Sequence, residues 1–538
     1  MKNIFYIILI SFVAQPLLSQ SQRDKNWILG YDLPIPGEPV SEIYGGMQIT
    51  FDEDSPNINT FNIYTLGVPG CANSEAGNLQ FYTSGCSIYD KNHEIMENGD
   101  DIIIGGTNAI NRCINDKAIL NLQSSTVILP IPNHPDRYLN FQLRLNQPTD
   151  TTVVLDKYFY ATVDMTANNG LGKVIAKHQI ALEDSLHDAV AAVRHGNGRD
   201  WWVVIPRGTE RQFWELRITP LGVAAEKILR TLPPQDKFNL VYEELEPPFR
   251  KVPLDEYMLE QWGGQAIFSP DGTKYARMVM GNGVEIFDFD RCTGEMRLLR
   301  AIPMPPDSNY IKVGRPIQGC GLAFSPNSRY LYFSNNLALF QLDACIECIQ
   351  DAAYQEIAYY DGYLSDGMFS TDFYQMRNGP DGKIYMHPTN GTKAIHVIES
   401  PNRAGKACDF RQHALPLPKW SYLVGNYFPN FNLYDVADSP CDSLGIDDPN
   451  PVTPPLTFDE FKIYPNPANT AVNIFIPQCE GAKIEIWNIS GQLVQENLSI
   501  TGAEIFTLPT QDWAAGVYII AAYLGKKEPE IRKLIVTH

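Results

Sequence analysis

The hydrophobic and polar positions in the middle of the chain repeat one hairpin pattern three times. In each copy a short apolar strand leads into a turn, and a second apolar strand follows it, at residues 265–279, 321–333 and 376–386. The first copy carries Ser-Pro-Asp-Gly at residues 269–272. Proline then occupies the second turn position, where its fixed φ suits a type I turn, and glycine occupies the favoured fourth position. The pattern therefore predicts strand, turn and strand in each copy.

A repeat of strands and turns, without a helical period between its copies, is typical of small sheets arranged around an axis in a β-propeller. Residues 26–90 and 126–180 are predicted to form the first two blades, and residues 189–205 a third around an Asn-Gly turn, which tolerates positive φ. The three repeated hairpins described above are predicted to form the next three blades. Residues 432–436 are expected to close the ring by pairing with the strand of Trp27, which would remove two exposed edges. This closure favours seven blades, with six as the alternative.

The pattern changes near the C-terminus. Residues 438–457 hold five prolines among acidic and small residues, which predicts an extended linker without a core. Seven short alternating strands follow in residues 458–538, as in a small antiparallel sandwich. The predicted fold is therefore all-β, with a propeller over residues 21–437.

The N-terminus has the pattern of a cleaved signal peptide over residues 1–20. A basic start is followed by an apolar run at residues 4–18 and a polar exit. That run is too short to span a bilayer and is interrupted by Ser11 and Gln15, and no other stretch reaches the roughly 20 apolar residues of a membrane span. No cysteine stands at the expected cleavage point, which disfavours lipid anchoring.

Composition fits an exported globular chain of more than one domain. The 538 residues are 44% hydrophobic, which is enough for sizeable cores, and the formal net charge is −20. Nucleic acids and anionic membranes attract basic surfaces, so this charge argues against both as partners. We interpret it as a solubilising acidic surface.

Ten cysteines in an exported chain predict an oxidising compartment and several disulfides. Proximity in sequence or to the ring closure gives three candidate pairs. The Cys-x-x-Cys spacing of the second pair also occurs in redox and zinc sites, but no second such motif and no thioredoxin-like pattern accompanies it. The candidate pairs are Cys71–Cys86, Cys345–Cys348 and Cys408–Cys441.

The sequence offers little evidence of catalysis. It has no nucleophile elbow, Walker A loop, His-Glu-x-x-His helix or Rossmann glycines, so we predict no enzyme activity and no cofactor. The acidic stretch at residues 52–59 lacks the central glycine and distal glutamate of an EF-hand, so no metal site is predicted. A propeller site would lie at the axial mouth, where innermost strands begin. Polar residues near such starts, which could equally be water-bound channel lining, are His187, Asp188, Gln265, Gln318 and Asp372.

Several C-terminal motifs occur in order at the end of the chain. They closely resemble the type A C-terminal sorting domain of the bacterial type IX secretion system. This resemblance implies an Ig-like sandwich that the type IX machinery recognises after periplasmic folding, which gives a secreted or outer-membrane surface location. An ordinary adhesion sandwich is the alternative. The motif residues are Tyr464, Pro465, Asn466, Pro467, Gly491, Gly516, Tyr518 and Lys533.

Residues 27–30, 77–82, 194–202 and 324–332 resemble secreted WD40-like or YVTN-like propellers. The Trp-Asp dipeptide of WD40 repeats is absent, so the likeness implies an architecture and no ligand. Two functions remain open: a module that binds an unknown protein or glycan, and a glycan hydrolase or lyase with paired carboxylates at the channel mouth.

Overall fold

The computed structural model divides into two compact units, Met1–Pro449 and Asn450–His538, and the break falls within the predicted linker. Each unit is described by itself. The predicted signal peptide lies outside the described residues. The structure describes residues 21–31, 45–52, 55–61, 70–104, 126–146, 154–207, 211–233, 264–279, 283–303, 321–345, 349, 352–422, 427–436, 439–442, 461–464, 468, 471–476, 482–500, 504–511, 513–523 and 529–537.

The first unit contains seven sheets of three or four antiparallel strands within its described residues, and in each sheet the strands follow chain order. Sheet 1 consists of β1 (Asn26–Leu29), β2 (Gly46–Phe51) and β3 (Pro56–Phe61), and sheet 2 of β4 (Gly70–Asn73), β5 (Leu79–Thr83) and β6 (Ile88–Asp90). Sheet 3 consists of β7 (Val127–Ile131), β8 (His134–Asn146), β9 (Val154–Asp164) and β10 (Lys173–Glu183). Sheet 4 consists of β11 (Ala191–Arg194), β12 (Trp201–Arg207), β13 (Gln212–Thr219) and β14 (Gly222–Thr231).

The remaining sheets of this unit come from the region of the three repeated hairpins. Sheet 5 consists of β15 (Ala266–Phe268), β16 (Lys274–Val279), β17 (Gly283–Phe289) and β18 (Met296–Pro303). Sheet 6 consists of β19 (Leu322–Phe324), β20 (Tyr330–Ser334), β21 (Ala338–Asp343) and β22 (Gln355–Tyr359). A small hairpin, β23 (Leu364–Ser365) and β24 (Phe369–Ser370), precedes sheet 7, which consists of β25 (Met376–Asn378), β26 (Ile384–Met386), β27 (Thr392–Ile398) and β28 (Phe410–Ser421).

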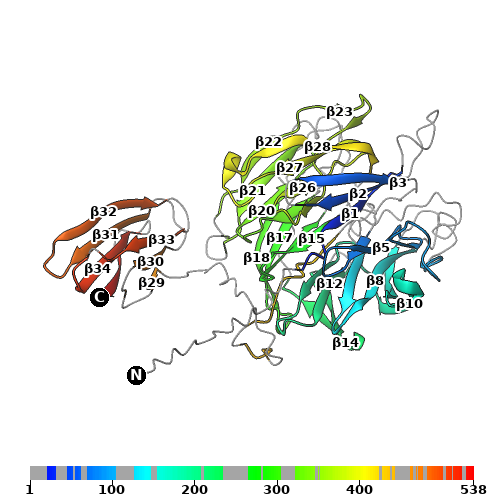
Figure 1. The fold of residues 1–538 in the computed structure, drawn as a ribbon, viewed down its shortest axis with the longest axis horizontal. Helices are drawn as coiled ribbons and strands as arrows, with labels where there is room; N and C mark the ends of the chain where they lie inside the picture. The colour runs from blue at the N-terminus through cyan, green and yellow to red at the C-terminus, as the bar shows by residue number, and fades with distance from the viewer. Residues whose placement is uncertain are drawn as a thin grey trace, which may run out of the picture. The chain divides into compact units, whose positions relative to one another are not determined.

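Seven hydrophobic clusters join these sheets into a closed ring. Each cluster draws its side chains from two successive sheets, and the last one joins Tyr385 and Val397 of sheet 7 to Trp27 and Ile49 of sheet 1. In Figure 1 the blue strands of sheet 1 accordingly lie beside the yellow-green strands of sheet 7. The first unit is therefore a β-propeller of seven blades. Seven was the blade number that the sequence favoured over six.

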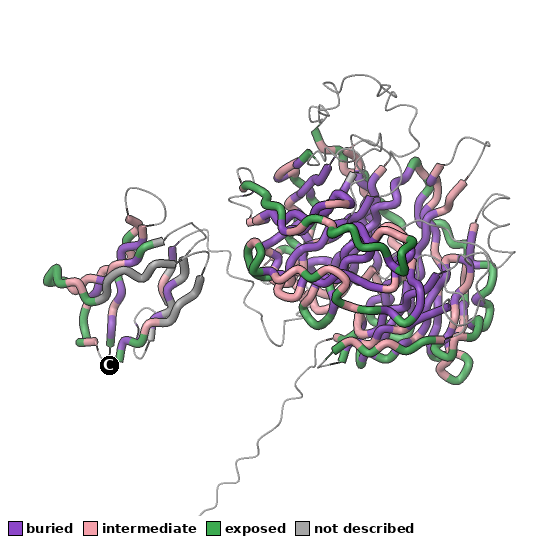
Figure 2. Tube along the Cα trace, turned by 90° about the horizontal axis from the view of Figure 1, so that it is seen from above, coloured by how far each residue is buried: buried purple, intermediate pink, exposed green. Residues whose placement is uncertain are grey.

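Strand alternation explains why both faces of each sheet are buried. Successive side chains point to opposite faces, so Tyr275 of β16 packs toward sheet 4 and Ala276 packs toward sheet 6. Full burial of a large apolar side chain contributes about 1.5–3 kcal/mol relative to exposure. Figure 2 shows the result as an interior of buried residues, with exposed residues at the turns and outer segments.

The three repeated hairpins fold as predicted. In the first, the N–H of Gly272 donates to the carbonyl of Ser269 at 2.8 Å, and Gly272 has a φ of 72°. The third makes the same bond between Gly382 and Gly379 at 3.1 Å. The second places Ser328 at this position with a φ of 61°. A serine there adopts a left-handed conformation that glycine would take at lower cost.

Two sequence predictions about the ring need correction. The predicted first blade is two sheets, because residues 26–61 and 70–90 each form a separate three-stranded sheet. Residues 432–436 do not extend the Trp27 strand within the described ladder, in which β1 pairs with β2. Instead Asn432 exchanges hydrogen bonds with Ser21, and Asp435 forms a bridge with Asn197 of the sheet 4 hairpin.

The second unit contains two antiparallel sheets that share one core. The first sheet has the order β29 (Lys462–Tyr464), β30 (Ala471–Ile476) and β33 (Glu504–Pro509), and the second has the order β32 (Leu493–Ile500), β31 (Ala482–Asn488), β34 (Gly516–Tyr523) and β35 (Glu530–Val536). Val472 and Ile474 of the first sheet share a hydrophobic cluster with Ile484 and Ile520 of the second. The seven predicted strands are therefore present, and they form a two-sheet sandwich.

Candidate functional site

The axis of the propeller is lined by the first strand of each sheet. The strands β11, β15, β19 and β25 contact one another in turn. Gln265 precedes β15 and is fully buried. Its Nε2 donates to the carbonyls of Leu322 at 2.9 Å and Met376 at 2.8 Å, and its Oε1 accepts the N–H of Leu322 at 3.0 Å. One side chain thus links sheets 5, 6 and 7.

His187 and Asp188 lie just before β11 and are 4% and 1% exposed. The Nδ1 atom of His187 is 3.2 Å from Asp188 Oδ1 and accepts the N–H of Ala189 at 3.2 Å. Because Nδ1 accepts this bond, a neutral His187 ring carries its proton on Nε2. A Cβ at Gly264 would lie 3.1 Å from His187 Cε1. The pair therefore adjoins the residue that precedes Gln265.

Asp372 is engaged in a contact between loops of sheets 6 and 7. Its Oδ1 accepts the N–H of Thr389 at 3.0 Å, and the adjacent Phe373 forms a backbone bridge with Asn336. Burial raises the pKa of Asp372, and its hydrogen bonds with Thr389 and Asn336 oppose that rise. Asp372 therefore accepts structural hydrogen bonds at this position. Gln318 lies outside the described residues.

Tyr427 is a residue of the ring interior that the sequence reasoning missed. Its hydroxyl accepts the N–H of Ala192 and donates to the carbonyl of the same residue, both at 2.9 Å. Ala192 lies on β11, and the Arg377 guanidinium of sheet 7 is 5.9 Å from the Tyr427 ring. Tyr427 begins a stretch rich in aromatic residues and asparagine, residues 427–432, which follows the last sheet. This stretch was the sequence signal that could have pointed to Tyr427.

The three candidate disulfides are wrong. Cys71 is a free thiol that donates to the carbonyl of Asn26 at 3.1 Å, and Cys86 is bonded to another partner. Cys345 and Cys408 are also free, and Cys441 is bonded to Cys292. Cys71 and Cys408 point into the clusters between sheets, where burial raises the pKa of the Cys408 thiol. Both thiols are buried in these cores and form no disulfide.

Within the described residues, no group of three or more His, Cys, Asp or Glu side chains is arranged to hold a metal ion. Among the same residues, no helix has the length and apolar character needed to cross a membrane.

The residues of the C-terminal motifs are spread over the sandwich. Gly491 turns the β31–β32 hairpin with a φ of 77°, and Gly516 begins β34. The Tyr518 hydroxyl donates to the carbonyl of Ala514 at 2.8 Å. Lys533 lies on β35 opposite Ile519, and Tyr464 ends β29. Pro465, Asn466 and Pro467 lie outside the described residues.

Residues 462–537 match the family of secretion system C-terminal sorting domains. This match confirms the resemblance predicted from the C-terminal motifs, and it lies inside the second compact unit. A search of curated proteins finds no match to the chain.

Several solved structures are weakly similar to this chain. The periplasmic gluconolactonase of Pseudomonas aeruginosa is 12% identical, with a TM-score of 0.39 over 74% of this chain and 97% of that one. A hypothetical selenium-binding protein from Sulfolobus tokodaii is 8% identical, with a TM-score of 0.40 over 71% and 88%. The β-propeller domain of Cps50 from Myceliophteria thermophila is 11% identical, with a TM-score of 0.29 over 77% and 97%. These similarities are too weak to bear on activity, and the propeller assignment rests on the seven sheets and their clusters.

Proposed function

We propose that this chain is a secreted or cell-surface protein exported by the type IX secretion system, with residues 458–538 as its sorting signal. The match of residues 462–537 to a sorting-domain family carries this proposal. The matched residues form a compact unit with its own core. Such a unit can fold and be recognised independently of the cargo that precedes it.

A reporter fusion tests this proposal. Residues 458–538, placed behind a signal peptide and a fluorescent reporter, should carry the reporter out of a host with a working type IX system. The same fusion should remain in the periplasm of a host that lacks the system. Retention of the reporter in the competent host, with the sandwich intact and folded, would contradict the proposal.

The final strand provides two variants of this fusion. Deleting residues 533–536 removes Leu534 and Val536 from the core and leaves residues 516–519 of β34 as an unpaired edge, so the reporter should collect in the periplasm. Lys533→Ala changes an exposed side chain and leaves that core in place. It therefore separates a role of Lys533 in recognition from a role in folding. Normal export of the truncated fusion would also contradict the proposal.

We further propose that the propeller is a binding module for a protein or a glycan. Two residues at its predicted mouth, Gln265 and Asp372, already use their polar atoms in contacts between sheets. The sequence also carries none of the catalytic motifs sought. A glycan and protein array probed with the oxidised mature chain, residues 21–538, should yield a saturable ligand. Turnover of a bound glycan would instead favour the alternative, a hydrolase or lyase.

A further inference from the structure

Residues 427–436 and 439–442, here called the closing segment, return from the last sheet to the hairpin ends of sheets 4 and 5. Phe428 packs in the clusters on both sides of sheet 1, and Phe431 lies 5.6 Å from the ring of Trp201 in sheet 4. Asn430 Nδ2 donates to the carbonyl of Pro270 in the sheet 5 hairpin at 2.7 Å. Together with the bonds from Tyr427 to Ala192, these contacts connect the segment to sheets 1, 4 and 5.

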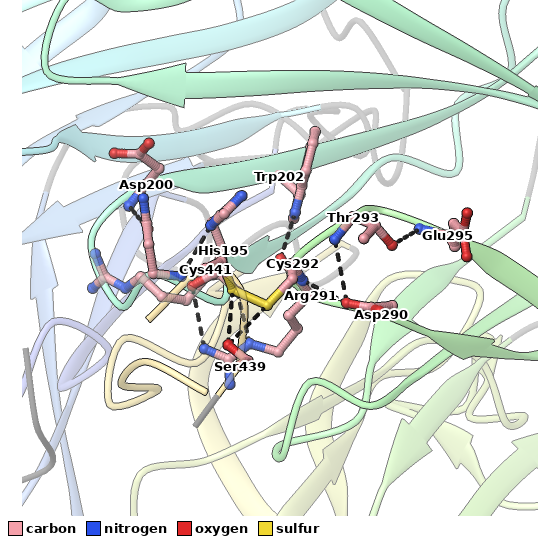
Figure 3. Close-up of a disulfide and its surroundings, with 12 residues drawn as sticks. His195, Asp200, Trp202, Asp290, Arg291, Cys292, Thr293, Glu295, Ser439 and Cys441 are labelled. Carbon is pink, nitrogen blue, oxygen red and sulfur yellow. Dashed lines mark hydrogen bonds between the residues drawn. A yellow bond between two sulfur atoms is a disulfide. The ribbon is translucent and has the colours of Figure 1, made fainter. Parts of the chain in front are cut away.

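One turn of sheet 5 holds the end of this segment both by hydrogen bonds and covalently. Figure 3 shows this turn, Asp290 to Glu295, around the disulfide between Cys292 and Cys441. Arg291, which precedes Cys292, donates through Nε to the carbonyl of Arg194 at 2.9 Å and through Nη2 to the carbonyl of Tyr434. The turn thereby contacts both the sheet 4 hairpin and the closing segment.

The neighbouring hairpin is shaped to admit the disulfide. Gly196 lies against both sulfurs, and a Cβ there would approach Cys441 Sγ to 2.5 Å and Cys292 Sγ to 2.7 Å. The carbonyl of Gly196 also accepts the N–H of Val436 at 2.7 Å. Ser439 Oγ lies 3.2 Å from each sulfur. Sheet 4, sheet 5 and the closing segment therefore meet at a single point.

The position of the disulfide in the chain gives it a specific mechanical role. Cys441 lies after Tyr427, Asn430 and Val436 in sequence, and before residues 443–457 of the predicted linker. A pull on the linker is therefore borne first by the bond to Cys292, and a cut in the linker leaves the segment attached through that bond. Without that bond, the same disturbance acts directly on the few hydrogen bonds of the segment.

We infer that the Cys292–Cys441 disulfide is an oxidative latch that holds the closing segment across the hairpin ends of sheets 4 and 5. In its oxidised state the disulfide keeps the closing segment bound to these hairpin ends, even when the linker is pulled or cut. Reduction by a dithiol transfers two electrons and two protons, breaks the Sγ–Sγ bond and gives two thiols, while the dithiol becomes a cyclic disulfide. The released segment then opens locally while the sheets remain folded.

Hydrogen exchange of the mature chain tests this latch. Cys441→Ser should speed exchange at the Val436 amide by at least about tenfold, because its bond to Gly196 then opens by local rather than global unfolding. The Val204 amide in the middle of sheet 4 should be accelerated much less than the Val436 amide, because it exchanges only when sheet 4 unfolds. Cys345→Ser removes a thiol that is already free and is the matched control, with unchanged exchange at both amides.

Reduction of the wild-type chain with dithiothreitol provides a second arm that needs no substitution. It should reproduce the faster exchange at Val436 and make Cys292 and Cys441 available for alkylation, and reoxidation should reverse both effects. Unchanged exchange at Val436 in Cys441→Ser and in the reduced chain would overturn the inference. Equal acceleration in all sheets of Cys441→Ser would also overturn it, because the bond would then be a general stabiliser.

Discussion

Loss of the Gln265 side chain should weaken the propeller axis, because it links three sheets. Replacing it with methionine, which has a similar length, removes the donor to Leu322 and Met376 and the acceptor for Leu322. The N–H and the carbonyl of Leu322 then stay buried without this partner, at about 1–3 kcal/mol each. The Met376 carbonyl keeps its bond from Arg377 Nη1 at 3.1 Å. The expected loss of unfolding free energy is therefore about 4 kcal/mol. Gln265→Met should still fold, because the clusters between sheets do not include this residue.

This loss can be measured as a shift in the unfolding midpoint. Unfolding entropy is about 2.1 cal/mol/K per residue, so a cooperative unit of about 420 residues should lose about 4–5 °C in Tm. Calorimetry of the mature chain gives this shift directly. The matched control is Gln179→Met on the exposed part of β10, where the side chain bonds only the carbonyl of Lys177, and its Tm should change by less than about 1 °C.

A second substitution at the same position tests the hydrogen-bond pattern itself. In Gln265→Glu an ionised carboxylate would face the carbonyls of Leu322 and Met376, which have no proton to offer it. Its destabilisation should exceed that of Gln265→Met above pH 7 and shrink at lower pH, where the carboxyl can be protonated. A Gln265→Met variant with the Tm of its control would refute the reasoning that this carboxamide ties three sheets together.

The remaining predictions concern charge, the latch and catalysis. Burial raises the pKa of Glu215 from 4.5 to about 7, so its contribution to stability is fully present below pH 4.5 and is lost as pH rises through 7. Glu215→Gln should flatten the fall in the urea midpoint between pH 5 and 8, and an unchanged profile would contradict this. Gly196→Ala should lower the yield of the Cys292–Cys441 peptide in non-reducing mass spectrometry, because its Cβ would overlap both sulfurs, whereas a normal yield would show that the hairpin can shift. Incubation with glycans should give no product by mass spectrometry, and any product lost in Asp188→Asn or Asp372→Asn would show that the chain is an enzyme.

The sequence predicted those features of the fold that depend on neighbouring residues. The Ser-Pro-Asp-Gly turn at residues 269–272 fixes its hairpin locally, and alternation along β16 determines which residues face each neighbouring sheet. The split between sheets 1 and 2 was missed, because the strands at residues 26–51 and 79–90 have similar patterns. Their separate strand ladders, and the cluster that Ile28 and Tyr82 share, show that they belong to adjacent blades.

The axial contacts and the disulfide depend on residues far apart in the chain. For this reason the sequence predicted neither the partners of Gln265 nor the pairing of the cysteines. Gln265 was predicted to lie near an innermost strand, but its role requires the positions of Leu322 and Met376, more than 50 residues away. Cys292 and Cys441 are 149 residues apart and meet only once the ring is closed. Position near the expected ring closure therefore favoured Cys408 for Cys441, although Cys408 belongs to the core between sheets 6 and 7.

The hydrogen bonds between Ser21 and Asn432 join positions 411 residues apart, and this separation sets the order of events in folding. Contacts of such long range form slowly, because the closure entropy of the whole intervening chain must be overcome first. Until these contacts form, the apolar face of sheet 1 that packs on sheet 7 has no neighbour. A folding chain of this protein therefore exposes an aggregation-prone surface until its last blade packs, and a chaperone that shields Trp27 and Ile49 should raise the yield of folded protein.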